Sequence, residues 1–208
     1  YGETGEGPIR AFLHDLAVRP ETALYISCKL AVHFLSDAPD DAVVQAMATV
    51  WMRTGGSLMD VYGALLHHPA AWEPTAQKAR QPWDFILSAL RGLRVTGAQV
   101  TDWPTPRLKE AVIQPLRAMG QSWKSPPGPD GWPEGLHNWI TPQGLAERIG
   151  WAMRWPAEFS NPLPDPTAFA ETVLGDRASA AILWAVVRAE SLAEGVGIVL
   201  SSPEFNRR

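Results

Sequence analysis

The sequence contains a single cysteine, Cys28, among 208 residues. One thiol excludes an intramolecular disulfide and any metal centre built from several cysteines. It also leaves the cellular location open, because a lone thiol is compatible with reducing and with oxidising compartments. At this length the chain can bury a substantial apolar core without cross-links or metals.

Long apolar runs and an excess of positive charge are also absent. The longest strongly apolar stretch, from Ala178 to Val187, is shorter than the ~18 residues that a membrane-spanning helix requires. Lysine and arginine number 18 against 22 acidic residues, which gives a net charge of −4. Proteins that bind a phosphate backbone are usually basic. We therefore predict no transmembrane segment and no nucleic-acid partner.

Strong catalytic motifs are missing as well. The sequence has no phosphate-binding glycine loop, no HExxH, no GxSxG and no calcium-binding loop. The neighbouring His67 and His68 point in different directions on a helix and are poorly spaced to share a metal ion. At a helix end they are better placed to bond free carbonyl groups. We predict no catalytic residue, no metal and no cofactor.

Apolar residues at spacings of three and four dominate, whereas alternating β-branched runs are rare. This pattern predicts an all-α fold, an irregular bundle of about eight to ten helices that forms a single domain over residues 1–208. Ile9, Phe12, Leu13 and Leu16 mark a first helix. Asp40 is expected to cap a third helix, because an aspartate side chain can accept bonds from the first free N–H groups.

Two helices carry more specific predictions. In the helix that begins at Pro20, a stripe formed by Leu24, Cys28, Ala31 and Leu35 is expected to face the core, which makes Cys28 a small buried side chain. In the helix after Thr105-Pro106, a proline interrupts the hydrogen-bond ladder at position 115. That helix is expected to kink or break there.

Residues 121–140, QSWKSPPGPDGWPEGLHNWI, are too rich in proline and glycine for a helix and predict a long ordered loop. Aromatic rings with a few polar groups are typical of a ligand-binding cleft. The alternative is that the indoles fold inward and anchor the loop. The candidate ligand-binding residues are Trp123, Trp132, Glu134, His137, Asn138 and Trp139.

Five separated segments resemble a known family. They are HDLAVRPETALYISCKLAVHFLSD, GGSLMDVYGALLHHPAAW, RQPWDFILSALRGL, GWPEGLHNWITPQGLAERIGWA and the closing LSSPEFNRR. In this collinear order they resemble the bacterial domain of unknown function family 1800. Members of that family are much longer, so the resemblance implies that this chain is their C-terminal half. It implies no activity, cofactor or catalytic residue.

Two hypotheses about function follow. The first is a non-catalytic helical module that binds a partner protein or a polymer, and the N-terminal half of the same protein is the expected contact. The alternative is an enzyme whose site lies in a cleft shared with that N-terminal half. In that case His14, Glu134 or His137 is expected to contribute from this side, since clefts between domains often hold such sites.

Overall fold

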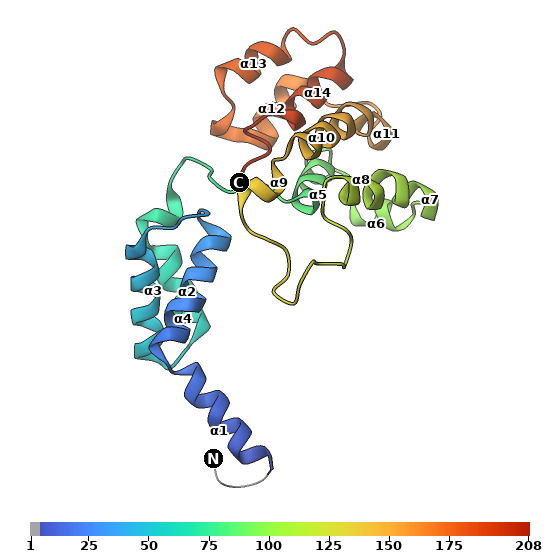
Figure 1. Ribbon diagram of the computed structural model, residues 1–208. Helices are drawn as coiled ribbons and strands as arrows, with labels where there is room; N and C mark the ends of the chain where they lie inside the picture. Colours follow the sequence, from blue (N-terminus) through green and yellow to red (C-terminus); the bar gives the residue numbers. More distant parts are fainter. Residues whose placement is uncertain (1–4) are drawn as a thin grey trace. The chain divides into compact units, whose positions relative to one another are not determined.

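A computed structural model describes residues 5–208, and over these residues it is helical with only two isolated β-bridges (Figure 1). The predicted all-α class is confirmed. Its helices divide into two compact units, residues 1–78 and 79–208. That the two units fold as one domain stays a prediction. Within residues 5–208, no helix has the length and apolarity needed to cross a membrane.

The described residues of unit 1, 5–78, form four α-helices and one short 3-10 helix. Helix α3 packs against both α2 and α4. The side chain of Asp40 accepts the N–H of Ala42 at 2.9 Å, as its predicted role as a cap requires. The elements are α1 (Glu6–Ala17), α2 (Pro20–Phe34), α3 (Asp41–Thr54), α4 (Leu58–His67) and η1 (Pro69–Trp72).

The buried face of α2 differs from the predicted stripe. Ala23, Ser27 and Ala31 are buried, whereas Leu24 and Cys28 are exposed. The prediction of a buried Cys28 is therefore wrong. Small side chains allow two helices to pack closely. Here they face the core, Ile26 and Leu30 pack against it while partly buried, and Leu24, Tyr25 and Phe34 are exposed.

Helix α1 buries none of its side chains. Its large apolar residues, among them Ile9, Phe12 and Leu13, are exposed. Its end is held to the rest of unit 1 by the indole N–H of Trp51, which donates to the carbonyl of Ala17 at 2.9 Å. The sequence predicted this helix correctly, but the helix projects from α2–α4 instead of packing into a core.

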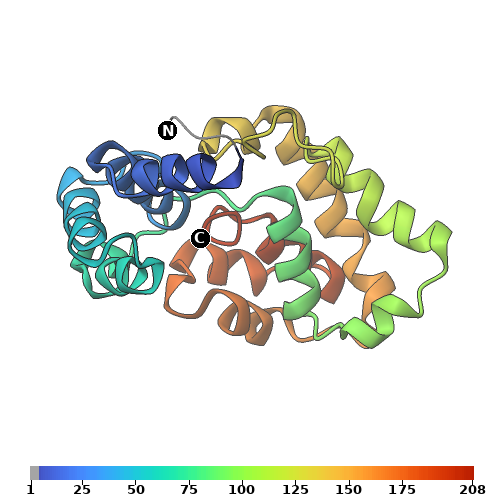
Figure 2. The same ribbon diagram turned by 90° about the horizontal axis from the view of Figure 1, so that it is seen from below.

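Unit 2 has one larger core, in which α10 packs against α8 and α14, and Figure 2 shows α10 running alongside the helix that ends in α8. Phe85 on α5 contacts Trp151 on α10 and Phe205 near the C-terminus in edge-on geometry. The elements are α5 (Pro82–Gly92), α6 (Gly97–Thr101), α7 (Thr105–Leu108), η2 (Lys109–Ile113), α8 (Gln114–Ala118), α9 (Leu136–Trp139), α10 (Pro142–Arg154), α11 (Pro156–Phe159), α12 (Pro166–Leu174), η3 (Gly175–Arg177), α13 (Ala180–Val186) and α14 (Leu192–Ser201).

A π-helical turn lies in the helix that contains Pro115, directly before the position at which the sequence predicts a kink or break. The turn, η2, separates α7 from α8, and the N–H of Gln114 bonds the carbonyl of Lys109, five residues earlier. In a regular α-helix the carbonyl of Ala111 would accept from residue 115, which as proline has no N–H. The indole N–H of Trp151 donates to that carbonyl at 2.8 Å.

Candidate functional site

The segment at 121–140, predicted as a loop, contains one short helix, α9, and part of its tryptophan content holds the segment in place. Trp139 is buried, only 2% exposed, and its indole N–H donates to the carbonyl of Pro133 at 2.9 Å. The rings of Trp132 and Trp139 pack edge to face with their centroids 6.0 Å apart. These contacts fit the anchoring alternative, because both indoles contact the loop itself.

The other candidate residues of the loop lie at its surface or partly covered. His137 and Asn138 are exposed, and the Asn138 amide lies 3.2 Å from both the His137 Nε2 atom and the Gly135 carbonyl. Glu134 is half-buried, and Trp123 is exposed and packs on Trp83 with ring centroids 4.6 Å apart. None of the six residues lines either groove described below. Ligand binding by this loop stays a prediction.

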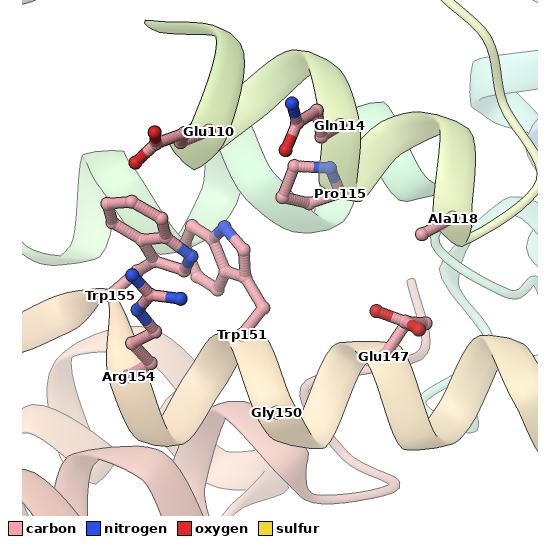
Figure 3. Close-up of a pocket in the computed structure, with 9 residues that line it drawn as sticks. All are labelled: Glu110, Gln114, Pro115, Ala118, Glu147, Gly150, Trp151, Arg154 and Trp155. Carbon is pink, nitrogen blue, oxygen red and sulfur yellow. The ribbon is translucent and has the colours of Figure 1, made fainter. Parts of the chain in front are cut away.

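A polar groove lies in unit 2 between α10 and the helix interrupted by η2 (Figure 3). Its volume is about 670 Å³. The carboxylates of Glu110 and Glu147 stand on opposite walls, and the guanidinium of Arg154 lies over the Trp155 ring, 4.8 Å from its centroid. The lining residues are Glu110, Gln114, Pro115, Ala118, Glu147, Gly150, Trp151, Arg154 and Trp155.

The indoles of this polar groove serve the fold. Trp151 and Trp155 are both buried, so neither offers an open ring face to a ligand. The Trp151 N–H is also already used, because it donates to the carbonyl of Ala111. The remaining polar groups are exposed and spread along the two helices, and residues 5–208 contain no cluster of three His, Cys, Asp or Glu side chains suited to a metal ion. The geometry here supports helix packing more than recognition.

A second groove, in unit 1, is apolar and measures about 860 Å³. The side chains that stand out from it are large: Phe34 is 58% exposed, Leu66 56% and Trp72 70%. We call this surface the apolar groove. Its lining residues are Leu30, His33, Phe34, Leu35, Tyr62, Leu65, Leu66, Ala71 and Trp72.

Local contacts fix the exposed rings of the apolar groove. The indole N–H of Trp72 donates to the carbonyl of Leu66 at 2.7 Å. Phe34 packs edge-on against the His33 ring, with centroids 4.7 Å apart. His67 Nδ1 lies 2.6 Å from the carbonyl of Gly63, which is the helix-end role expected for this histidine. The groove is therefore lined by aromatic side chains whose positions are set in advance.

Most of the large hydrophobic side chains that are exposed in the described part of the chain belong to unit 1. Of the large hydrophobic side chains exposed within residues 5–208, 13 belong to unit 1 and 7 to the larger unit 2. Exposed apolar patches on a soluble protein mark interaction surfaces. This imbalance makes unit 1 the candidate region for an interaction surface.

A buried arginine in unit 2 is a further unusual group. Arg148 is fully buried, and burial lowers the pKa of its guanidinium to about 10, although Asp84 acts in the opposite direction. Arg148 donates to the Asn206 side chain at 2.9 Å and to the carbonyl of Arg80 at 2.8 Å. It therefore ties α10 to two segments far away in the sequence.

The comparison with known families matches residues 1–207 to the model described as a protein of unknown function, DUF1800. The chain belongs to the DUF1800 family. No curated protein and no solved structure matches it. The resemblance seen in the five sequence segments is thus confirmed over essentially the whole chain.

The sequence of this DUF1800 chain predicts a binding site in the tryptophan-rich loop and does not predict the apolar groove. The signal in the sequence for the apolar groove was Phe34, a large apolar residue of α2 that lies outside the stripe predicted to face the core. Arg148 could not be found in advance, because its partners lie 58 and 68 residues away. The enzyme hypothesis, with His14, Glu134 or His137, stays a prediction.

Proposed function

We propose that this DUF1800 chain is a non-catalytic binding module that holds an amphipathic helix of a partner protein in the apolar groove. The observation that carries the proposal is the set of three large side chains, Phe34, Leu66 and Trp72, each more than half exposed around one apolar cavity. Leaving such side chains in water is unfavourable by roughly 25 cal/mol per Å² of apolar area. A partner that covers them recovers this free energy.

The chemistry of the lining favours a protein over a polysaccharide. Recognition of a sugar requires several converging hydrogen-bonding groups, whereas among the described residues that line the groove only His33, Tyr62 and Trp72 carry a polar group, and the Trp72 N–H already donates to Leu66. An amphipathic helix instead presents apolar anchors at i, i+3 or i+4, and i+7 to an apolar groove. Tryptophan and other large side chains supply most of the binding energy at such interfaces.

Preorganisation supports the same proposal. The hydrogen bond from Trp72 to Leu66 and the packing of Phe34 on His33 hold the two rings before any partner arrives. Ordering a flexible side chain on binding costs about 0.5–1.5 kcal/mol, and this cost is reduced for rings that are already fixed. The N-terminal part of a longer DUF1800 protein is the partner that the sequence resemblance favours.

Site-specific photocrosslinking in the full-length protein tests the proposal. A benzoylphenylalanine placed at Trp72 or at Leu66 should form an adduct with one defined polypeptide segment, identified by mass spectrometry. The matched control is the same probe at Met59, which is 77% exposed in unit 1 but does not line the groove. Probes at Trp72 and Met59 that give the same adducts, or no adduct at Trp72, would contradict the proposal.

A second experiment separates binding from folding. Phe34→Asp and Leu66→Asp should abolish the adduct formed at Trp72, because each places a charge in the apolar contact. Both side chains are exposed, so the melting temperature should remain within a few degrees of the wild type. If the adduct persists in both variants, the apolar groove is not the docking surface.

A further inference from the structure

Arginines gather in unit 2 where the last residues of the chain run beside residues 79 and 80. Ala79 and Arg207 form an isolated β-bridge, and the N–H of Arg80 donates to the carbonyl of Asn206 at 2.9 Å. Arg208, the next residue after Arg207, is close enough to act on Arg80 electrostatically. Arg177, from η3, reaches the same place.

Two of these guanidinium groups converge on a single uncharged atom. Arg80 Nε and Arg177 Nη1 each donate to the carbonyl oxygen of Arg207, both at 3.2 Å. A guanidinium has five N–H donors, so most donors of the pair remain directed elsewhere. A neutral carbonyl cannot balance two positive charges. The pair is therefore held together by the fold and not by a counter-ion of the protein.

The electrostatics of the pair show the resulting repulsion. Burial lowers the pKa of Arg80 most, Arg177 lowers it further, and Arg208 acts in the same direction. Asp84 opposes this effect, but its carboxylate already pairs with Arg208 at 3.2 Å. The chain as a whole is acidic, with a net charge of −4. This concentration of positive charge runs against the average of the molecule.

Other acids nearby do not reach the pair. Asp176 precedes Arg177 in the sequence and Glu204 lies three residues before Arg207. Within residues 5–208 no carboxylate lies within 4.0 Å of the charged nitrogens of Arg80 or Arg177. The two arginines are thus without an acidic partner in the described part of the chain.

We propose that Arg80 and Arg177 form a surface site for a doubly charged oxyanion, the phosphate group of a ligand. Planar guanidinium groups bind phosphate oxygens through paired, charge-assisted hydrogen bonds. A bound phosphate would accept from donors of both arginines and neutralise the charge that the Arg207 carbonyl leaves uncompensated. Phe205, whose ring lies 4.7 Å below the Arg80 guanidinium, supports the site from beneath.

Phosphate titration tests the site directly, with the whole chain as the protein and inorganic phosphate as the probe. At constant ionic strength set by chloride, phosphate should raise the melting temperature of the wild type in a saturable way, with a matching isotherm by calorimetry. Arg177→Gln should weaken phosphate binding at least tenfold. Arg177→Lys, which keeps the charge but loses the planar fork, should fall between the two.

Arg188→Gln is the matched control, since Arg188 is exposed, stacks on Trp184 and is not among the charged groups that act on Arg80. It should bind phosphate like the wild type. An acetate arm separates phosphate from carboxylate chemistry, and acetate should bind much more weakly. The proposal is overturned if the wild type shows no saturable response, if Arg177→Gln responds like the wild type, or if acetate binds as tightly as phosphate.

Discussion

Replacing Trp151 by phenylalanine should destabilise unit 2 by an amount that depends on Pro115. The proline has no N–H for the carbonyl of Ala111, four residues earlier. The indole N–H of Trp151 on α10 donates to this buried carbonyl at 2.8 Å. The tryptophan therefore satisfies an acceptor that the proline leaves without its helical donor, and the two residues should be energetically coupled.

The size of the effect follows from two costs. Trp151→Phe leaves the Ala111 carbonyl without the indole donor, which costs about 1–3 kcal/mol for a buried polar group. It also removes part of a ring that is only 3% exposed, which costs roughly a further 1–2 kcal/mol in lost packing. The expected loss of unfolding free energy is about 2–5 kcal/mol.

The second variant isolates the hydrogen bond. Pro115→Ala restores an N–H that can bond the Ala111 carbonyl, so only the packing cost of Trp151→Phe should remain in that background. The double-mutant cycle should then give a coupling free energy of about 1–3 kcal/mol, the value of the first cost. Urea unfolding of the wild type, both single variants and the double variant, followed by circular dichroism, measures it.

A control substitution and the measured coupling free energy test whether Trp151 replaces the missing donor. Trp184→Phe should change the unfolding free energy by less than about 0.5 kcal/mol, because Trp184 is largely exposed. If the two core substitutions are additive within about 0.5 kcal/mol, the level expected of independent sites, Trp151 does not replace the donor that Pro115 lacks.

Three further predictions concern the anchors of unit 2. Trp139→Ala should lower the unfolding free energy by about 3–5 kcal/mol, because Trp139 is buried. Trp123→Ala should lower it by less than about 1 kcal/mol, because Trp123 is exposed. Equal losses in urea unfolding would contradict the anchoring role of Trp139. Gly92→Ala should lower the unfolding free energy by about 1–3 kcal/mol, because the added Cβ would lie 2.7 Å from Val173. Gly150→Ala has open space around it and should stabilise α10 by about 0.5–1 kcal/mol. Thermal melts of the two variants compare these effects. Arg148→Ala should cost about 3 kcal/mol or more, because the acceptors on Asn206 and Arg80 lose a charged donor; a change below about 1 kcal/mol in calorimetry would show that water replaces it.

The helices themselves were predictable because their boundaries depend on neighbouring residues. Asp40 caps α3, and Gly55 ends it in the left-handed region at φ 64°. Thr141 accepts the N–H of Gly144 at 3.0 Å at the start of α10. Each of these contacts spans a few residues, so the chemistry visible in the sequence is the chemistry that acts in the structure.

The candidate sites were less predictable because exposure depends on distant parts of the chain. Composition drew attention to the tryptophan-rich loop, yet the number of indoles cannot show which of them will be covered. Trp139 is buried, and Trp72, outside that loop, is exposed. The apolar groove requires α2, α4 and η1 to be placed side by side, and no local pattern encodes that placement.

Residue patterns alone are enough to predict the all-α class, the positions of the main helices, an irregularity near Pro115 and membership of the DUF1800 family. Only the tertiary structure decided which face of each helix is buried. On α2 the close approach of α3 selects Ala23, Ser27 and Ala31 for the interior and leaves Phe34 outside. Spacing fixes which side chains share a face, but the packing partner decides which of those faces meets water.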